Sequence, residues 1–217
     1  MNQEEIIQKT QEFVQQKFSG EGTGHDWYHI NRVRKLALEI AQAERADLFI
    51  VELGALLHDI ADHKFHGGDL AVGPKKAQEW LESVGADQET IEKVCHIVAN
   101  VSFKGAGSKN AMESLEGKVV QDADRLDASG AIGIARAFTY GGTKGRLIYQ
   151  PGVEPGYHKN FQEHQKEAAS TLNHFYEKLL HIKNLMNTAT GLTLAEERHR
   201  YVEDFLSRFL AEWEGEN

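Results

Sequence analysis

A histidine and an aspartate, His58 and Asp59, stand side by side at the end of the apolar segment 53–57. Apolar residues cover every face of this segment, which predicts a buried helix. An ionised carboxylate in such surroundings is costly unless a partner compensates its charge. A divalent metal ion is a natural partner, because it binds a neutral imidazole nitrogen and a carboxylate oxygen together. The pair therefore points to a metal site.

Two other segments carry residues that could complete such a site. Upstream, His25 and His29 lie four residues apart, so we expect them on one helical face. His25 also begins a second His-Asp dipeptide, and a bare dipeptide is weak evidence. Downstream, three aspartates occur within residues 122–127 of a partly apolar segment, and Asp124 follows Val120 by four residues, near its apolar stripe. The metal hypothesis depends on these partners.

The composition limits the kinds of protein that this chain can be. With 217 residues it can bury a sizeable core. Its net charge of −9 argues against a large surface for a nucleic acid backbone, and its single cysteine, Cys95, excludes an internal disulfide and a cysteine-based zinc site. The N-terminus is acidic and polar, and no apolar run is long enough for a membrane span. We therefore expect a cytoplasmic protein with no nucleic acid polymer and no membrane as a partner.

Helical periodicity predicts an all-α fold. Apolar residues recur at helical spacing along most of the chain, and no segment alternates convincingly as a strand would. The expected helices cover residues 6–18, 30–41, 46–60, 74–84, 87–98, 119–138, 161–186 and 193–213, the last opened by a capping box at Thr193 and Glu196. Residues 140–157 are rich in glycine and carry Lys144 and Arg146. This stretch is either a solvated loop or a lid that brings positive charge to an anionic ligand.

The order of the chemically interesting residues resembles that of a known family. His29, then His58 with Asp59, then Asp124 matches the H…HD…D order of the HD-domain metal-dependent phosphohydrolases. The residues that flank each of these positions are similar as well, so the resemblance covers about 24–138. Four residue types in one order with matching neighbours are far more specific than the dipeptide alone.

The rest of the chain resembles one branch of this family. The run 131–136, the glycine-rich loop and residues 192–213 look like the small bacterial YpgQ-like branch of this family. The resemblance implies a single HD domain over 1–217. Its metal-binding core would lie at about 24–138, with C-terminal helices at 157–213 packed on that core.

The resemblance also implies a ligand set. Carried over residue by residue, it gives His29, His58, Asp59 and Asp124 as the metal ligands. Two imidazoles and two carboxylates would suit Mn²⁺, Fe²⁺, Co²⁺, Ni²⁺ or Zn²⁺ and leave room for water or substrate oxygens. We expect one ion, with Mn²⁺ as the working metal and Mg²⁺ as a weaker substitute, because no extra pair of histidines matches a second site.

A metal ion in an open site acidifies a bound water and polarises a phosphoryl oxygen, which suits attack on phosphorus. Asp62 lies three residues after Asp59, on the same face of the expected helix. In the resembling families an acidic residue here orients or deprotonates the nucleophile, so we assign Asp62 that catalytic role. The alternative is a simple carboxylate at a helix end.

Several cations lie near or between the motif segments, and a leaving group with several negative charges would need them. The predicted substrate contacts are Lys64, His96, Lys104, Arg125, Asp127, Lys144 and Arg146. Alternatively the lysines are solvated, His96 is a satisfied core histidine, and Asp127 orients a metal ligand from behind. The YpgQ-like branch is associated with hydrolysis of nucleoside triphosphates to monophosphate and pyrophosphate, which gives the leading function and a small-molecule nucleotide as partner.

Other functions stay open at this point. A nucleotide 5′-monophosphatase or a phosphodiesterase could use the same metal. A nucleotide-binding regulatory module with a structural metal would need no turnover. A plain helical scaffold would leave the buried pair of His58 and Asp59 unexplained. The sequence leaves open whether the chain forms a homodimer.

Overall fold

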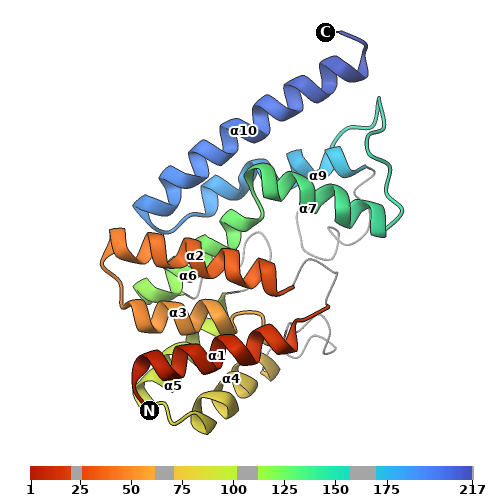
Figure 1. Cartoon of the computed structure of the whole chain (residues 1–217). Coiled ribbons are helices and arrows are strands. Elements are labelled where there is room, and N and C mark those ends of the chain that lie inside the picture. Colours follow the sequence, from red (N-terminus) through yellow and green to blue (C-terminus); the bar gives the residue numbers. More distant parts are fainter. Residues whose placement is uncertain (21–25, 62–70, 102–111, 157–169, 217) are drawn as a thin grey trace. The chain divides into compact units, whose positions relative to one another are not determined.

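The computed structural model describes residues 1–20, 26–61, 71–101, 112–156 and 170–216 (Figure 1). Within these ranges the regular elements are helices, and the one pairing of extended backbone is an isolated bridge between Leu147 and Ser170. The prediction of an all-α fold is therefore confirmed. None of the described helices is both long and apolar enough to cross a membrane.

The chain divides into two compact units, and the division falls within a single helix. The first unit comprises Met1–Phe103 and Lys109–Ala123, and the second consists mainly of Asp124–Asn217. Helix α6, Leu115–Asp127, runs through the division.

Helix α3 forms the centre of the first unit. The other helices that lie wholly in this unit are α1 (Gln3–Lys17), α2 (Trp27–Glu44), α4 (Val72–Ser83) and α5 (Gln88–Asn100). Helix α3, Leu48–Leu57, packs against α1, α2 and α5, while α4 packs against α5 (Figure 1). Eight of its ten residues are buried, because neighbours cover it on several sides. The expectation of a buried helix before His58 is therefore met.

Gly54 lets α3 lie close to its neighbours. A Cβ atom at this position would lie 3.1 and 3.2 Å from side-chain atoms of Ile97 and 3.4 Å from Val120. We expect Gly54→Val to lower the free energy of unfolding by about 1–3 kcal/mol, because extra methyl groups overpack this core. Urea denaturation measures this loss. Gly142→Val is the matched control, since a Cβ at that helical glycine meets nothing within 4 Å, and an equal loss in both variants would contradict the packing argument.

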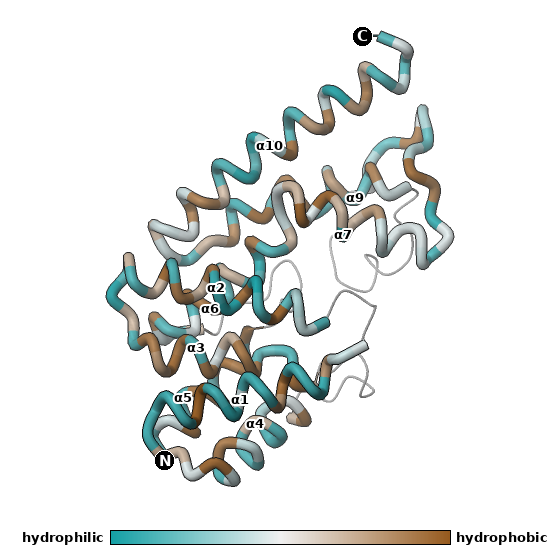
Figure 2. Tube along the Cα trace, viewed as in Figure 1, coloured by the Kyte–Doolittle hydropathy of each residue, from teal (hydrophilic) through white to brown (hydrophobic). Residues whose placement is uncertain are grey.

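The second unit is built around an aromatic core. Besides the end of α6 it contains α7 (Gly130–Thr143), α9 (Thr171–Glu177), the 3₁₀ helix η2 (Leu179–Leu185) and α10 (Ala189–Trp213). Phe138 of α7 contacts Phe175, Phe205 and Phe209 at ring-centroid distances of 5.5–6.3 Å. Figure 2 shows hydrophobic and hydrophilic residues alternating along α10, as expected for a helix with one packed face.

Several predicted helix boundaries were wrong. The helix expected over 119–138 is two helices, because Ser129 is extended and Gly130 has a φ of +63°. In the described part of 161–186, α9 ends before Lys178, whose φ of −137° is not helical. The 3₁₀ helix η2 follows, and it buries Leu179 and Ile182 three residues apart, which matches its three residues per turn.

The last helix begins earlier than its capping-box pattern indicated. Thr188 caps α10, because its side chain accepts a hydrogen bond of 3.0 Å from the amide of Gly191. Thr193 lies inside the helix, where its hydroxyl donates to the carbonyl of Ala189. The cap at Thr188 therefore starts the helix about one turn before the position that the pattern at Thr193 indicated.

Candidate metal centre

The first turn of α2 places His29. Asp26 precedes the helix in an extended conformation, and its carboxylate accepts a hydrogen bond of 2.8 Å from the amide of His29. Such a cap satisfies one of the amides that a helix start leaves without a partner. The aspartate of the first His-Asp dipeptide is thus a helix cap, whereas His25 lies outside the described residues. His29 itself is 1% exposed, which removes its imidazole from water.

The end of α3 places and orients His58. The helix ends at Leu57, three residues earlier than expected, so carbonyls of its last turn lack helical partners. Nδ1 of His58 lies 2.7 Å from the carbonyl oxygen of Ala55. A carbonyl only accepts, so Nδ1 carries the proton and donates it. In the neutral imidazole, a proton on Nδ1 leaves the lone pair on Nε2, and this nitrogen of His58 lies 3.3 Å from Nε2 of His29.

Asp59 completes a triangle of donor atoms. Its Oδ2 lies 3.4 Å from Nε2 of His29 and 3.5 Å from Nε2 of His58. These residues are the group of possible metal ligands found among the described residues. Three atoms at these separations could all bind one ion at about 2.1 Å, a usual distance for nitrogen and oxygen ligands. The donor set and its spacing therefore fit a divalent ion, with further coordination positions open.

A charged pair ties α2, which carries His29, to α3, which ends directly before His58. Nε of Arg34 on α2 donates to Oε1 of Glu52 on α3 at 2.7 Å, and both side chains are largely buried. Charge-assisted hydrogen bonds of this kind are among the stronger contacts in proteins. The pair fixes how α2 lies along α3 and so supports the approach of His29 to His58.

The structure describes only some of the other predicted site residues. Asp124 lies in the last turn of α6 and is half-buried. Its role as fourth ligand stays a prediction. Asp62, Lys64 and Lys104 lie outside the described residues. Because α3 ends before His58, the helical-face argument that linked Asp62 to Asp59 does not apply.

Two predicted substrate contacts have protein partners in the second unit. The carboxylate of Asp127 is 2% exposed and accepts a hydrogen bond of 2.6 Å from Arg136. Arg125 donates to the backbone carbonyl of Leu185. These contacts give both residues a structural part, and their contact with substrate stays a prediction.

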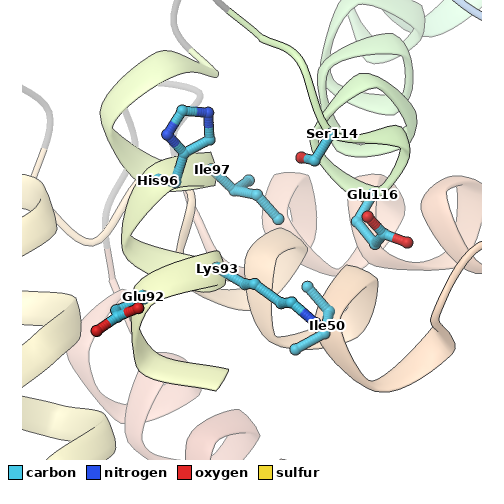
Figure 3. A pocket seen from close by; sticks show the side chains of 7 residues that line it. All are labelled: Ile50, Glu92, Lys93, His96, Ile97, Ser114 and Glu116. Atoms are coloured by element: carbon cyan, nitrogen blue, oxygen red, sulfur yellow. The ribbon is translucent and has the colours of Figure 1, made fainter. Parts of the chain in front are cut away.

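His96 lies on the exposed side of α5 and lines an open pocket of about 280 Å³ (Figure 3). The reading of His96 as a core histidine was therefore wrong. The pocket is lined by Ile50, Glu92, Lys93, His96, Ile97, Ser114 and Glu116. A hydrogen bond to Glu89 raises the pKa of Lys93, so its ammonium stays charged beside His96. None of the three possible metal ligands, His29, His58 and Asp59, is among the described residues that line this pocket.

Lys144 and Arg146 flank an exposed aromatic ring. Nζ of Lys144 and Cζ of Arg146 each lie 5.6 Å from the ring centroid of Tyr140, and half of that residue is exposed. Two cations around one open ring form a surface that could meet an anionic, planar group.

Sequence reasoning missed the residues that hold the site in place. The cap at Asp26 follows a recognisable pattern, an aspartate directly before a helix. The pair of Arg34 and Glu52 has no local signal, since its members are 18 residues apart on different helices. Within the second unit, the contacts of Arg136 and Arg198 with the end of α6 likewise have no local signal.

The model of the HD domain family matches residues 26–129. The chain is 42% identical over 196 residues to YpgQ of Bacillus subtilis (strain 168), covering 89% of this chain and 87% of that protein. The chain is a YpgQ-like member of the HD-domain superfamily.

Solved structures agree with this membership. An HD-superfamily hydrolase from Bacillus thuringiensis has a sequence 45% identical to that of this chain. The alignment covers 98% of this chain and 99% of the hydrolase, and the TM-score is 0.79. The Bacillus subtilis YpgQ structure in complex with ADP is 37% identical, covers 95% of this chain and 96% of its own, and gives a TM-score of 0.71. Of the two His-Asp dipeptides in the chain, the pair of His58 and Asp59 lies wholly within the residues that match the HD domain family.

Proposed function

We propose that this protein is a metal-dependent phosphohydrolase of nucleotides. The observation that carries the proposal is the triangle of Nε2 of His29, Nε2 of His58 and Oδ2 of Asp59, whose sides are 3.3–3.5 Å. We add Asp124 as fourth ligand on the resemblance to the family. One divalent ion, with Mn²⁺ as the working metal and Mg²⁺, Fe²⁺, Co²⁺, Ni²⁺ or Zn²⁺ as substitutes, would occupy the site.

Each residue of the proposed site has a separate role. A bound divalent ion supplies an acidified water and polarises a phosphoryl oxygen. His58 is held by Ala55 in the tautomer whose Nε2 can act as a ligand. Asp59 contributes negative charge beside two neutral imidazoles, and Asp62 orients the attacking water or accepts its proton. The cations named as substrate contacts neutralise the leaving group.

The leading reaction is hydrolysis of a nucleoside triphosphate to the monophosphate and pyrophosphate. Two findings support a nucleotide as substrate: the related YpgQ is solved with ADP, and Lys144 and Arg146 frame the open ring of Tyr140. A polyphosphate needs several cations when it leaves, and the chain places cations on both sides of its motif segments. The protein would act in the cytoplasm on free nucleotides.

A product assay resolved by phosphorus NMR tests this proposal. Nucleoside triphosphates, nucleoside monophosphates and a phosphodiester are each incubated with the protein and Mn²⁺. Pyrophosphate together with nucleoside monophosphate supports the leading reaction. Orthophosphate released from a nucleoside monophosphate indicates a monophosphatase, and cleavage of a diester indicates a phosphodiesterase. Nucleotide binding without any product indicates a regulatory module.

The role of Asp62 gives a separate prediction. We expect Asp62→Asn to bind Mn²⁺ like the wild type but to hydrolyse substrate about 10²–10⁴ times more slowly, the usual contribution of a general acid or base. The asparagine keeps the size of the side chain and removes its ability to take a proton. Calorimetry with Mn²⁺ and a steady-state rate measure the two properties. An unchanged rate would exclude Asp62 from the chemistry.

A further inference from the structure

Helices α2 and α3 of the first unit form a helical hairpin whose open end carries two of the metal ligands. Only residues 45–47 separate the helices, which pack side by side (Figure 1). The turn is well defined, because Arg45 ends α2 in the left-handed conformation and the carboxylate of Asp47 caps α3. His29 lies in the first turn of α2, and His58 directly follows α3. Both imidazoles therefore lie at the end of the hairpin that is remote from the turn.

This distance from the turn makes the position of His29 sensitive to the angle between the two helices. At a rise of 1.5 Å per residue, His29 lies about 20 Å along α2 from the turn. Even a small rotation of α2 against α3 changes the separation of its Nε2 from Nε2 of His58, which is 3.3 Å. A metal ion tolerates little change here, because its bonds to nitrogen and oxygen ligands have lengths of about 2.0–2.2 Å. A contact beyond the turn is needed to fix the angle.

Arg34 and Glu52 provide such a contact. Nε of Arg34 donates to Oε1 of Glu52 at 2.7 Å, and Nη2 of the same guanidinium contacts the same oxygen. Both side chains are largely buried, so water and salt screen the pair only weakly. Arg34 follows His29 on α2, and Glu52 precedes His58 on α3. The pair thus joins the two helices between the turn and the ligands.

We infer that Arg34 and Glu52 are positioning residues, which set the metal affinity of the site through the angle of the hairpin and not through their own charges. The inference rests on the proposed function, because it needs the triangle of His29, His58 and Asp59 to hold an ion. Neither residue of the pair belongs to that triangle. Partners behind a metal ligand typically change metal affinity by about 10–100-fold. We expect the lower end of this range for a pair that acts through helix packing.

Titration calorimetry with Mn²⁺ alone, without nucleotide, separates position from charge. We expect Glu52→Gln and Arg34→Met each to weaken Mn²⁺ binding by about tenfold, because each breaks the pair and leaves the other side chain without its opposite charge. If only charge mattered, loss of Glu52 would weaken the binding of a cation, but loss of Arg34 would strengthen it. Glu39→Gln, at an exposed position on α2, is the matched control and should bind Mn²⁺ like the wild type.

A charge swap separates positioning from general loss of structure. Arg34→Glu and Glu52→Arg each place like charges together, whereas a protein with both changes regains an ion pair and should recover part of the lost affinity. Wild-type or tighter binding in Arg34→Met would overturn the inference, as would a swapped protein that binds no better than either single reversal. A wild-type protein that binds no Mn²⁺ would instead overturn the metal centre itself. Circular dichroism in the presence of chelator shows whether each variant keeps its helices.

Discussion

Asp59→Ala should lose its divalent ion and its hydrolytic activity together, while its helices persist. Asp59 contributes the single carboxylate oxygen of the triangle, at 3.4 and 3.5 Å from the two imidazole nitrogens. Without it, two neutral imidazoles would have to hold a doubly charged ion with less compensating charge. A catalytic metal contributes several kcal/mol to a transition state, and each 1.4 kcal/mol is a factor of ten in rate. Hydrolysis is therefore expected to fall by about a thousandfold or more.

Metal analysis after gel filtration, a steady-state rate and far-ultraviolet circular dichroism measure the three properties. Asp204→Ala is the matched control, because it removes the same group from an exposed position on α10. It should keep its metal, its rate and its helices. If Asp59→Ala retained one equivalent of Mn²⁺ and wild-type turnover, Asp59 would not be a ligand.

The family of the chain and the clustering of His29, His58 and Asp59 could be predicted, because both depend on residue types and on their order in the sequence. A histidine with an aspartate after a run without charge is costly to bury without a partner, and this cost is visible in the sequence. The structure places Nε2 of His29 beside that pair, as the predicted order requires. His29 lies 29 residues before His58 in the sequence. Its selection over His25 came from the resemblance to the family.

The end of each helix was harder to predict than its existence. Ile60 is an apolar residue three positions after Leu57, so periodicity extended α3 by three residues. In the structure the helix stops where the side chain of His58 takes the carbonyl of Ala55. A side chain that competes for a backbone carbonyl leaves no trace in a hydrophobic pattern. The division of 119–138 at Gly130 has a similar cause, a local backbone conformation.

The partners that hold the end of α6 could not be predicted from one sequence. Arg198 bonds a carbonyl 72 residues away, and Arg136 bonds a carboxylate nine residues away across the turn between two helices. Neither spacing follows a helical or strand period, and arginines are common on protein surfaces. His96 shows the converse: it lies on a helix with apolar residues, yet its side chain is exposed.

Removing the divalent ion from the wild type should lower its thermal midpoint substantially. An ion that binds only the folded chain stabilises it by an amount that grows with its concentration, about 4.1 kcal/mol at a thousand times its dissociation constant. The unfolded chain cannot present this site, because its ligands come from the start of α2 and from the turn after α3. For a chain of 217 residues, each kcal/mol shifts the midpoint by about 2–4 °C. We therefore expect chelation to lower the midpoint by about 8–16 °C.

Differential scanning calorimetry with and without chelator, on protein loaded with Mn²⁺, measures this shift. Asp59→Ala supplies the internal control, since a protein without the site should melt at the same temperature in both buffers. Its midpoint should also match or exceed that of the chelated wild type, because alanine removes a carboxylate that the empty site leaves largely buried. Equal midpoints for the wild type with and without chelator would mean that His29, His58 and Asp59 hold no ion in the folded protein.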